Sequence, residues 1–168
     1  MSNLRLINET SASSVASLSI TDIFSADFDI YKLAIYSDGF SGNSALNVRY
    51  INSLGTVVTT NRYDYARLLL KADTSFGEDR STGATFYHTG ELSDNGLGQL
   101  LYIFTPFIST SRTYSLFQNQ SMSSTNGRGG KGITFLTHTT PITGIHLYSD
   151  NGGTMTNLNV KTYGVRVE

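Results

Sequence analysis

Short segments in which apolar and polar residues alternate recur along this chain. In residues 45–51 the apolar Leu46, Val48 and Tyr50 alternate with polar neighbours, and residues 30–36 follow the same pattern. Successive side chains of a β-strand point to opposite faces, so this alternation predicts strands with one buried face. Similar apolar stretches bounded by Gly, Asn, Asp and Ser predict further strands at residues 4–7, 14–20, 56–59, 100–104, 113–117, 133–137, 142–148 and 158–167.

The spacing of these stretches predicts the fold class. They follow one another at roughly 8–15 residues and almost without proline, which is typical of a sandwich or barrel and not of alternating strands and helices. We expect an all-β chain with a single antiparallel β-sandwich domain, jelly-roll-like, over residues 14–168. Residues 1–13 are polar apart from a small apolar patch, and we expect them to form an N-terminal arm that docks against a neighbouring subunit.

Several segments depart from the simple alternation. Residues 63–72 contain good helix formers and fit either a strand, which we favour, or a helix with Asn61 as its N-cap. Residues 100–104 are apolar on both faces, which indicates a central strand covered on both sides or a strand whose outer face meets another subunit. Residues 73–83 and 119–132 are polar, and we expect them to be long loops at the ends of the sandwich.

Composition narrows the range of partners. The net charge is −1 and only 15% of the residues are charged, so we expect no nucleic-acid binding. No apolar run approaches the roughly 18 residues that a membrane helix needs, so we expect no membrane insertion either. The chain has no cysteine, which excludes a disulfide framework, a thiolate zinc site and a cysteine nucleophile. The sequence does not open with the pattern of a signal peptide, and we expect the protein to be made in the cytoplasm of the cell that produces it.

No combination of residues predicts catalysis or a bound cofactor. The three histidines, His88, His138 and His146, lack the spacing of metal ligands. Residues 127–132 match the dinucleotide pattern G-x-G-x-x-G, but a polar stretch precedes them and a predicted strand follows; we interpret them as a flexible hairpin tip. Two acidic clusters in predicted loops could hold calcium, although solvated turn residues are the favoured interpretation. We therefore expect a non-enzymatic protein with no cofactor.

Aromatic residues in the predicted connectors are candidates for surface contact. The chain has ten Tyr and nine Phe, most of which are expected in the core. Phe40, Phe76, Phe86 and Tyr87 instead stand among polar connector residues. Exposed rings in such places can stack on sugars or anchor a protein interface, so we predict these four on the surface.

Four segments carry a recurrent combination of motifs. They are residues 23–33 (IFSADFDIYKL), 46–50 (LNVRY), 63–66 (YDYA) and 160–166 (VKTYGVR). In this order they resemble a type of small structural protein of tailed bacteriophages, with Phe28 where Tyr is usual and Val165 where Ile is usual. The resemblance covers about residues 14–72 and 142–167. It implies a jelly-roll-like sandwich on a virion, as a head decoration, a fibre or knob, or a tail-associated host-contact module, and it transfers no catalytic residues.

These observations predict a protein of the phage virion that acts by contact. We expect a capsid decoration or head-surface protein that forms a homo-oligomer, most often a trimer. Its expected partners are phage capsid or tail proteins, with host surface glycans as a further candidate. The alternative is a carbohydrate-binding, lectin-like module, for example in a tail-associated receptor-binding protein. The predicted oligomer contacts are Leu100, Tyr102, Phe104, Leu4, Leu6 and Ile7.

Overall fold

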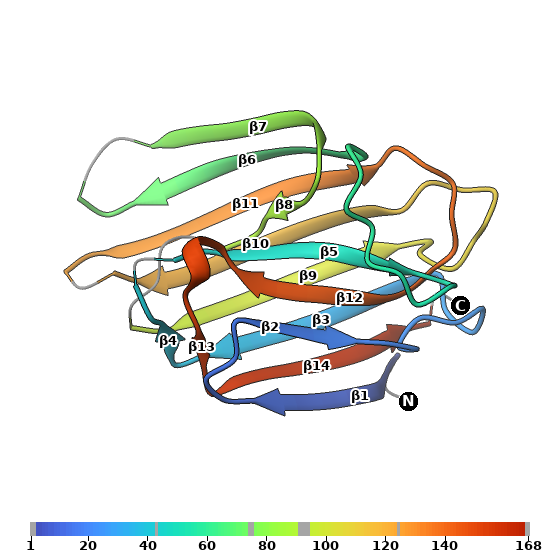
Figure 1. The fold of residues 1–168 in the computed structure, drawn as a ribbon, viewed down its shortest axis with the longest axis horizontal. Helices are drawn as coiled ribbons and strands as arrows, with labels where there is room; N and C mark the ends of the chain where they lie inside the picture. Colours follow the sequence, from blue (N-terminus) through green and yellow to red (C-terminus); the bar gives the residue numbers. More distant parts are fainter. Residues whose placement is uncertain (1–2, 43, 74–75, 91–94, 124, 167–168) are drawn as a thin grey trace.

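The computed structural model describes residues 3–42, 44–73, 76–90, 95–123 and 125–166, and in these residues the chain is built from strands (Figure 1). A single 3-10 turn, η1 (Asp150–Gly152), is the one helical element of the described chain. The strands are β1 (Leu4–Ala12), β2 (Ser17–Ile20), β3 (Ile30–Ser37), β4 (Gly39–Phe40), β5 (Leu46–Asn52), β6 (Tyr63–Lys71), β7 (Gly77–Ala84), β8 (Tyr87–His88), β9 (Leu97–Phe104), β10 (Tyr114–Met122), β11 (Gly127–Leu136), β12 (Ile142–Ser149), β13 (Met155–Thr156) and β14 (Leu158–Val165).

Two antiparallel sheets of unequal size pack into one sandwich. The large sheet has eight strands in the order β1-β14-β3-β9-β10-β11-β6-β7, and the small sheet has four in the order β2-β12-β5-β8. A short ribbon of β4 and β13 lies at one end. Figure 1 shows β12, β5 and β2 in front of the large sheet. The small sheet therefore covers one face of the large sheet and leaves the opposite face, here called the outer face, to solvent.

The core lies between the two sheets. Leu33 and Leu101 project inward from the large sheet and Val48 and Leu147 from the small sheet, and all four are fully buried. Burying an aliphatic side chain of this size contributes about 1.5–3 kcal/mol. The apolar positions whose alternation predicted these strands are thus the positions that face the core. The prediction of a single all-β antiparallel sandwich is confirmed.

Buried tyrosines tie irregular segments to the core. The Tyr63 hydroxyl donates to the Val58 carbonyl at 3.0 Å and accepts the Tyr50 backbone N–H at 2.9 Å. The Tyr31 hydroxyl donates to the Ser25 carbonyl at 3.0 Å and accepts the N–H of the same residue at 2.8 Å. Through these hydrogen bonds, which most buried hydroxyls in proteins make, each of the two tyrosines fixes the path of the connector it touches.

The N-terminal segment is part of the sandwich. Residues 4–12, which we expected within an arm over residues 1–13, form β1 and pair with β14 from Leu4↔Val165 to Ala12↔Leu158. In the structure this segment is therefore the edge strand of the large sheet, and it contains the short apolar patch. Its backbone N–H and C=O groups that face β14 form their hydrogen bonds with that strand of the same chain.

The ambiguous segments resolve into strands. Residues 63–71 form β6, so the strand interpretation is confirmed and the helix alternative is wrong. Much of the predicted loops 73–83 and 119–132 is also strand, as β7 and the facing ends of β10 and β11. Residues 56–59, expected as a strand, make only an isolated bridge between Val57 and Ile51. The polar strands were not predicted because they have no alternating apolar face of their own and are stabilised by pairing with neighbouring strands.

Candidate functional site

The outer face of the large sheet carries a continuous apolar surface. The strand registers align outward residues into rows; Leu116 of β10, for example, is opposite Tyr102 of β9 and Ile133 of β11. Two adjacent rows are largely apolar from β1 to β6, a width of about 29 Å at the usual strand spacing. We call them the apolar band. Its members are Leu4, Val165, Ile30, Phe104, Tyr114 and Phe135 in one row and Leu6, Tyr163, Tyr102, Leu116, Ile133 and Ala66 in the other.

The band faces solvent and has few charges. The rings of Tyr114 and Phe135 meet edge to face with centroids 5.5 Å apart. Within the rows the one charged residue before β6 is Lys32, whose Nζ lies 6.0 Å from the centroid of the Tyr102 ring, a cation–π arrangement. At the β6–β7 end the rows finish in charged residues. Six band members each expose 38–51% of their surface: Leu4, Leu6, Tyr114, Leu116, Ile133 and Phe135.

Strand β10 shows how the band arises from the sequence. Its inward positions carry small polar residues such as Ser115, while its outward positions begin with Tyr114 and Leu116. The Ser115 hydroxyl lies 2.5 Å from the Thr134 hydroxyl of β11, and both residues are buried. At the start of this strand the usual arrangement is therefore inverted: the buried Ser115 is satisfied by a hydrogen bond and Tyr114 and Leu116 lie outside, whereas the next inward residue, Phe117, packs in the core.

Most of the predicted oligomer contacts lie on this face. Tyr102, Phe104, Leu4 and Leu6 belong to the band, although the two pairs lie far apart in the sequence. Leu100 lies on the same outward face of β9, in the next row, and Leu101 and Ile103 fill the core. The segment over residues 100–104 is thus a central strand with an exposed apolar outer face.

The band has members that the sequence did not single out. Tyr114, Leu116, Ile133 and Phe135 form its centre. The alternation of Tyr114 and Leu116 with polar neighbours could have shown that both lie on one face of a strand. Alternation alone does not show whether that face is buried or exposed. The sixth predicted contact, Ile7, lies at a β-bulge, is half-buried and packs against the core; it is not part of the band.

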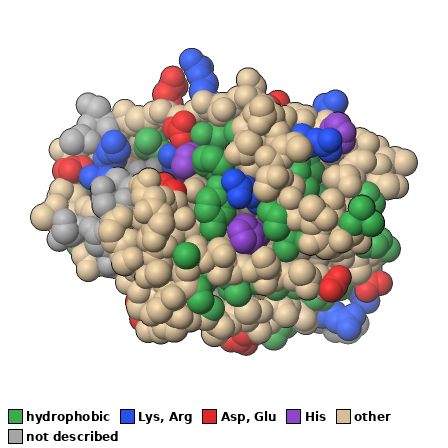
Figure 2. All heavy atoms as spheres, in the orientation of Figure 1, with side chains coloured by type: hydrophobic (Ala, Val, Ile, Leu, Met, Phe, Trp, Pro, Cys, Tyr) green, Lys and Arg blue, Asp and Glu red, His purple; other side chains and the backbone are tan. Residues whose placement is uncertain are grey.

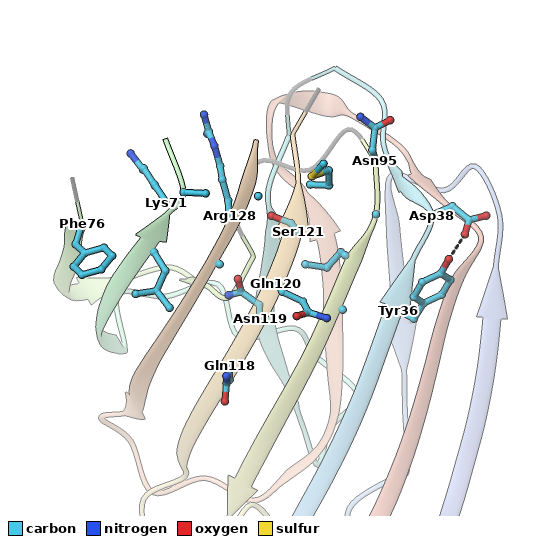
Figure 3. A pocket seen from close by; sticks show the side chains of 18 residues that line it. Tyr36, Asp38, Lys71, Phe76, Asn95, Gln118, Asn119, Gln120, Ser121 and Arg128 are labelled. Atoms are coloured by element: carbon cyan, nitrogen blue, oxygen red, sulfur yellow. Dashed lines mark hydrogen bonds between the residues drawn. The ribbon is translucent and has the colours of Figure 1, made fainter. Parts of the chain in front are cut away.

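A groove lies on the outer face beyond the band. One row of the sheet there runs through Tyr36, Gly98, Gln120, Gly129 and Leu70. The groove has a volume of about 820 Å³, and these residues line it. Figure 3 shows Gln120 between Tyr36 on one side and Phe76 on the other, and two glycines, Gly98 and Gly129, flank the glutamine in the neighbouring strands.

The groove combines amide groups with aromatic rings. Gln118 and Gln120 are exposed on β10, and neither side-chain amide makes a hydrogen bond within the described residues. Tyr36 exposes 54% of its surface and Phe76 exposes 71%, on opposite sides of the groove (Figure 3). Tyr36 donates a hydrogen bond of 2.5 Å to the Asp38 carboxylate. This bond lowers the pKa of Asp38 and raises the pKa of Tyr36.

A second cluster lies on the outer face of the small sheet. The Arg49 guanidinium sits 4.6 Å from the centroid of the Tyr148 ring and 6.0 Å from that of Phe86. His146 stacks on Tyr148, and its Nδ1 is 2.8 Å from the Ser19 hydroxyl. Figure 2 shows basic and histidine side chains among hydrophobic ones at the middle of this face. Arg49 Nε also donates to the Thr85 carbonyl, so the cluster holds the segment before β8 against the sheet.

The four predicted surface aromatics do not form one surface. Phe76 is exposed and lines the groove, and Phe86 is half-buried beside Arg49. Phe40 and Tyr87 are buried in the core, so their prediction as surface contacts was wrong. Both fall in very short strands, β4 and β8, whose polar sequence neighbours hide the inward direction of the rings.

Candidate cofactor positions have structural explanations. The glycine-rich residues 127–132 belong to β11, so the prediction of a hairpin tip is wrong. His88 and His146 lie on strands of the small sheet and His138 in a connector. Among the described residues, no group of three or more His, Asp or Glu is arranged to hold a metal ion. Within the same residues, no helix has the length and apolar character required to cross a membrane.

Comparisons with known proteins give only distant likenesses. No protein-family model and no curated protein sequence matches the chain. Among solved structures, the CBM22-1 xylan-binding domain of Paenibacillus barcinonensis Xyn10C is 10% identical with a TM-score of 0.30, covering 95% of this chain and 72% of that domain. Two particle structures of infectious bursal disease virus are also similar. The VP2 subviral particle is 10% identical with a TM-score of 0.14, covering 97% of this chain and 42% of that one. The T=1 particle is 14% identical with a TM-score of 0.12, covering 96% and 39%. Likenesses at this level assign neither a ligand nor a role to this chain.

Proposed function

We propose that this protein is a non-enzymatic structural subunit that assembles with further copies of itself through the apolar band. The observation that carries the proposal is the band: two adjacent rows of apolar side chains cross the outer face of the large sheet. Monomeric soluble proteins rarely leave such a continuous patch in water, and larger patches mark contact surfaces.

The exposed area of the band supports a protein interface. With six side chains exposed by 38–51% and others half-buried, the band exposes on the order of 600 Å² of apolar surface. A stable interface buries about 800 Å² on each partner, somewhat more than half of it apolar. The band and its polar margins therefore match the area that a subunit contact needs.

The charge distribution supports a second copy as the occupant. Copies related by a symmetry axis bring the residues nearest that axis close to their own equivalents, so like charges at the centre of such a contact would repel. The band is uncharged at its centre, where Tyr114, Leu116, Ile133 and Phe135 lie, and the whole chain has a net charge of only −1. A recess of about 630 Å³ next to Ala66 can accept a projecting side chain of the other copy; Leu116 and Ile133 line its apolar side, and charged residues of β6, β7 and β11 line the rest.

We further propose that the assembled subunit belongs to a tailed-phage particle, as a capsid decoration or head-surface protein. The support is the sequence resemblance over residues 23–33, 46–50, 63–66 and 160–166. Proteomic analysis of gradient-purified particles, with immunogold labelling of their heads and tails, tests this location. Detection in stoichiometric amount on the head is expected. Absence from purified particles contradicts the virion role without touching the proposed self-assembly.

Substitutions at the centre of the band test the assembly itself. Arginine at an apolar interface brings an unpaired charge into a contact that excludes water, so Ile133→Arg and Leu116→Arg are expected to dissociate the oligomer. Leu54→Arg is the control, because Leu54 lies in an exposed turn and is 86% exposed. Light scattering after gel filtration gives the molar mass; the expected trimer has three times the 18.3 kDa of one chain. An unchanged oligomer in both band variants overturns the proposed contact.

A further inference from the structure

We propose that the groove around Gln120 is a binding site for an uncharged oligosaccharide. This site is separate from the apolar band: Leu116 and Gln120 are four residues apart on β10, about 13 Å along the strand. Assembly through the band and binding in the groove can therefore be lost independently. Four features of the groove carry the inference, namely its shape, its unused amides, its aromatic sides and its lack of charge on the floor.

The shape of the groove comes from glycines on both sides of one glutamine. Gly98 of β9 and Gly129 of β11 stand directly opposite Gln120 in the two neighbouring strands. Neither has a side chain, so the sheet surface is low on both sides of Gln120, while Tyr36 and Leu70 rise at the two ends of the same row. A concave surface of this kind can hold a flat ring against the backbone.

The floor of the groove offers hydrogen bonds that the protein does not use. Each glutamine amide has two N–H donors and an oxygen with two acceptor positions. Gln118 and Gln120 point outward from the same strand, two residues apart, and make no side-chain hydrogen bond within the described residues (Figure 3). Each amide places a donor and an acceptor side by side, which suits neighbouring hydroxyl groups of a sugar because these also donate and accept.

The sides of the groove suit the apolar faces of sugar rings. Tyr36 and Phe76 are exposed aromatic side chains on opposite sides. Aromatic rings present an apolar body, and the hydroxyl of Tyr36 is already held by Asp38. With an aromatic ring on each side and amides between them, the groove can contact the C–H faces of a sugar and hydrogen-bond its hydroxyl groups.

The charges around the groove favour a neutral ligand. Its floor residues, Gln118, Gln120 and Met122 with the two glycines, are uncharged. Lys71 and Arg128 are opposite each other at inward positions of β6 and β11, and Figure 3 shows them pointing toward the end of the sandwich, away from Gln118. The low pKa of Asp38 leaves a negative charge near Tyr36. Lys71 and Arg128 line only the end of the groove, so an anionic ligand finds no cation on the floor and a carboxylate at the Tyr36 side.

The strand pairing disfavours a peptide in the groove. An extended peptide commonly binds by adding its backbone to a free sheet edge. The strands under the groove, β9, β10 and β11, are each paired on both sides. Only side chains and glycine backbone face the ligand, which suits recognition of hydroxyl groups and ring faces.

A glycan array tests the proposal with neutral β-glucan, xylan, mannan and galactan oligosaccharides beside sialylated, sulfated and uronic-acid glycans. The full-length protein is expected to bind at least one neutral oligosaccharide. Titration calorimetry with that oligosaccharide is expected to give roughly tenfold weaker binding for the double variant Gln118→Ala/Gln120→Ala, because two hydrogen-bonding groups are lost. Gly98→Leu is expected to abolish binding by filling the groove; a Cβ there lies at ordinary contact distance, 3.6 Å, from the Gln120 side chain.

Matched controls separate this site from the rest of the molecule. Asn61→Ala removes an exposed amide that does not line the groove and is expected to bind like the wild type. The glutamine variants are expected to keep the wild-type melting temperature and molar mass, which isolates the groove from the band. If Gly98→Leu fails to fold, the glutamine double variant decides alone. Binding of no neutral glycan, binding of charged glycans only, or equal affinity in the double variant overturns the proposal.

Discussion

His146 on the outer face of the small sheet has a basic and aromatic environment. Its ring stacks on Tyr148, with centroids 5.7 Å apart, and Arg49 lies over the same tyrosine ring. Burial and the nearby Arg49 guanidinium lower the pKa of His146. Burial and Arg67 likewise lower the pKa of His88. Both imidazoles therefore stay neutral in the folded protein at a pH where the unfolded chain already takes up protons.

Acid is expected to destabilise the protein through these histidines. Because the folded pKa values are lowered, the unfolded state binds more protons below the ordinary histidine value of 6.5. The free energy of unfolding should be highest above that pH and fall as the pH drops from about 7 to 5. Urea unfolding of His146→Gln is expected to show a weaker fall, whereas His138→Gln, at an exposed position, should keep the wild-type profile. A fall of equal size in His146→Gln would contradict this account.

At the scale of single elements, β11 marks a limit of prediction from sequence. Its first six residues are Gly-Arg-Gly-Gly-Lys-Gly, a composition typical of a loop. The strand forms because β10 and β6 supply its hydrogen-bond partners and because the Phe117 ring covers Gly132 across the strand. Strands with an apolar alternation, such as β3 and β5, were predictable because their own side chains specify the buried face.

Gly132 and Gly127 allow a comparison within that strand. A Cβ at position 132 would come within 2.6 Å of both the Ala66 carbonyl and the Phe117 ring, whereas one at position 127 meets nothing within 4 Å. Gly132→Ala is therefore expected to lower the free energy of unfolding by about 1–3 kcal/mol through overpacking. Gly127→Ala should stay within about 0.5 kcal/mol of the wild type. Chemical denaturation measures both, and equal stabilities would show that β11 shifts to accept the methyl group.

Strand β1 gives a second prediction for an element. Deleting residues 1–13 removes the partner of β14 along its length and the packing of Ile7 against the core. The lost ladder hydrogen bonds and apolar contact are expected to lower the free energy of unfolding by roughly 2–5 kcal/mol. The measurement is the urea midpoint of the truncated chain against the full chain. A truncated protein as stable as the full one would restore the picture of a separable arm.

At the scale of the whole molecule, the sequence predicted the fold more fully than the site. The sandwich follows from apolar alternation in strands such as β5, but the band depends on strand order. Leu6 and Leu116 share a row because β14, β3 and β9 stand between β1 and β10. No pattern within either segment contains that order. The groove likewise needs Gly98 and Gly129 on either side of Gln120, residues that are far apart in the sequence.

Self-assembly through the outer face of the large sheet is the central claim, and the mass of the unmodified protein in solution tests it most directly. Sedimentation equilibrium over a range of concentrations is expected to give a defined multiple of 18.3 kDa that dissociates only on dilution. A mass of 18.3 kDa at every concentration, up to the highest that stays soluble, would contradict the claim.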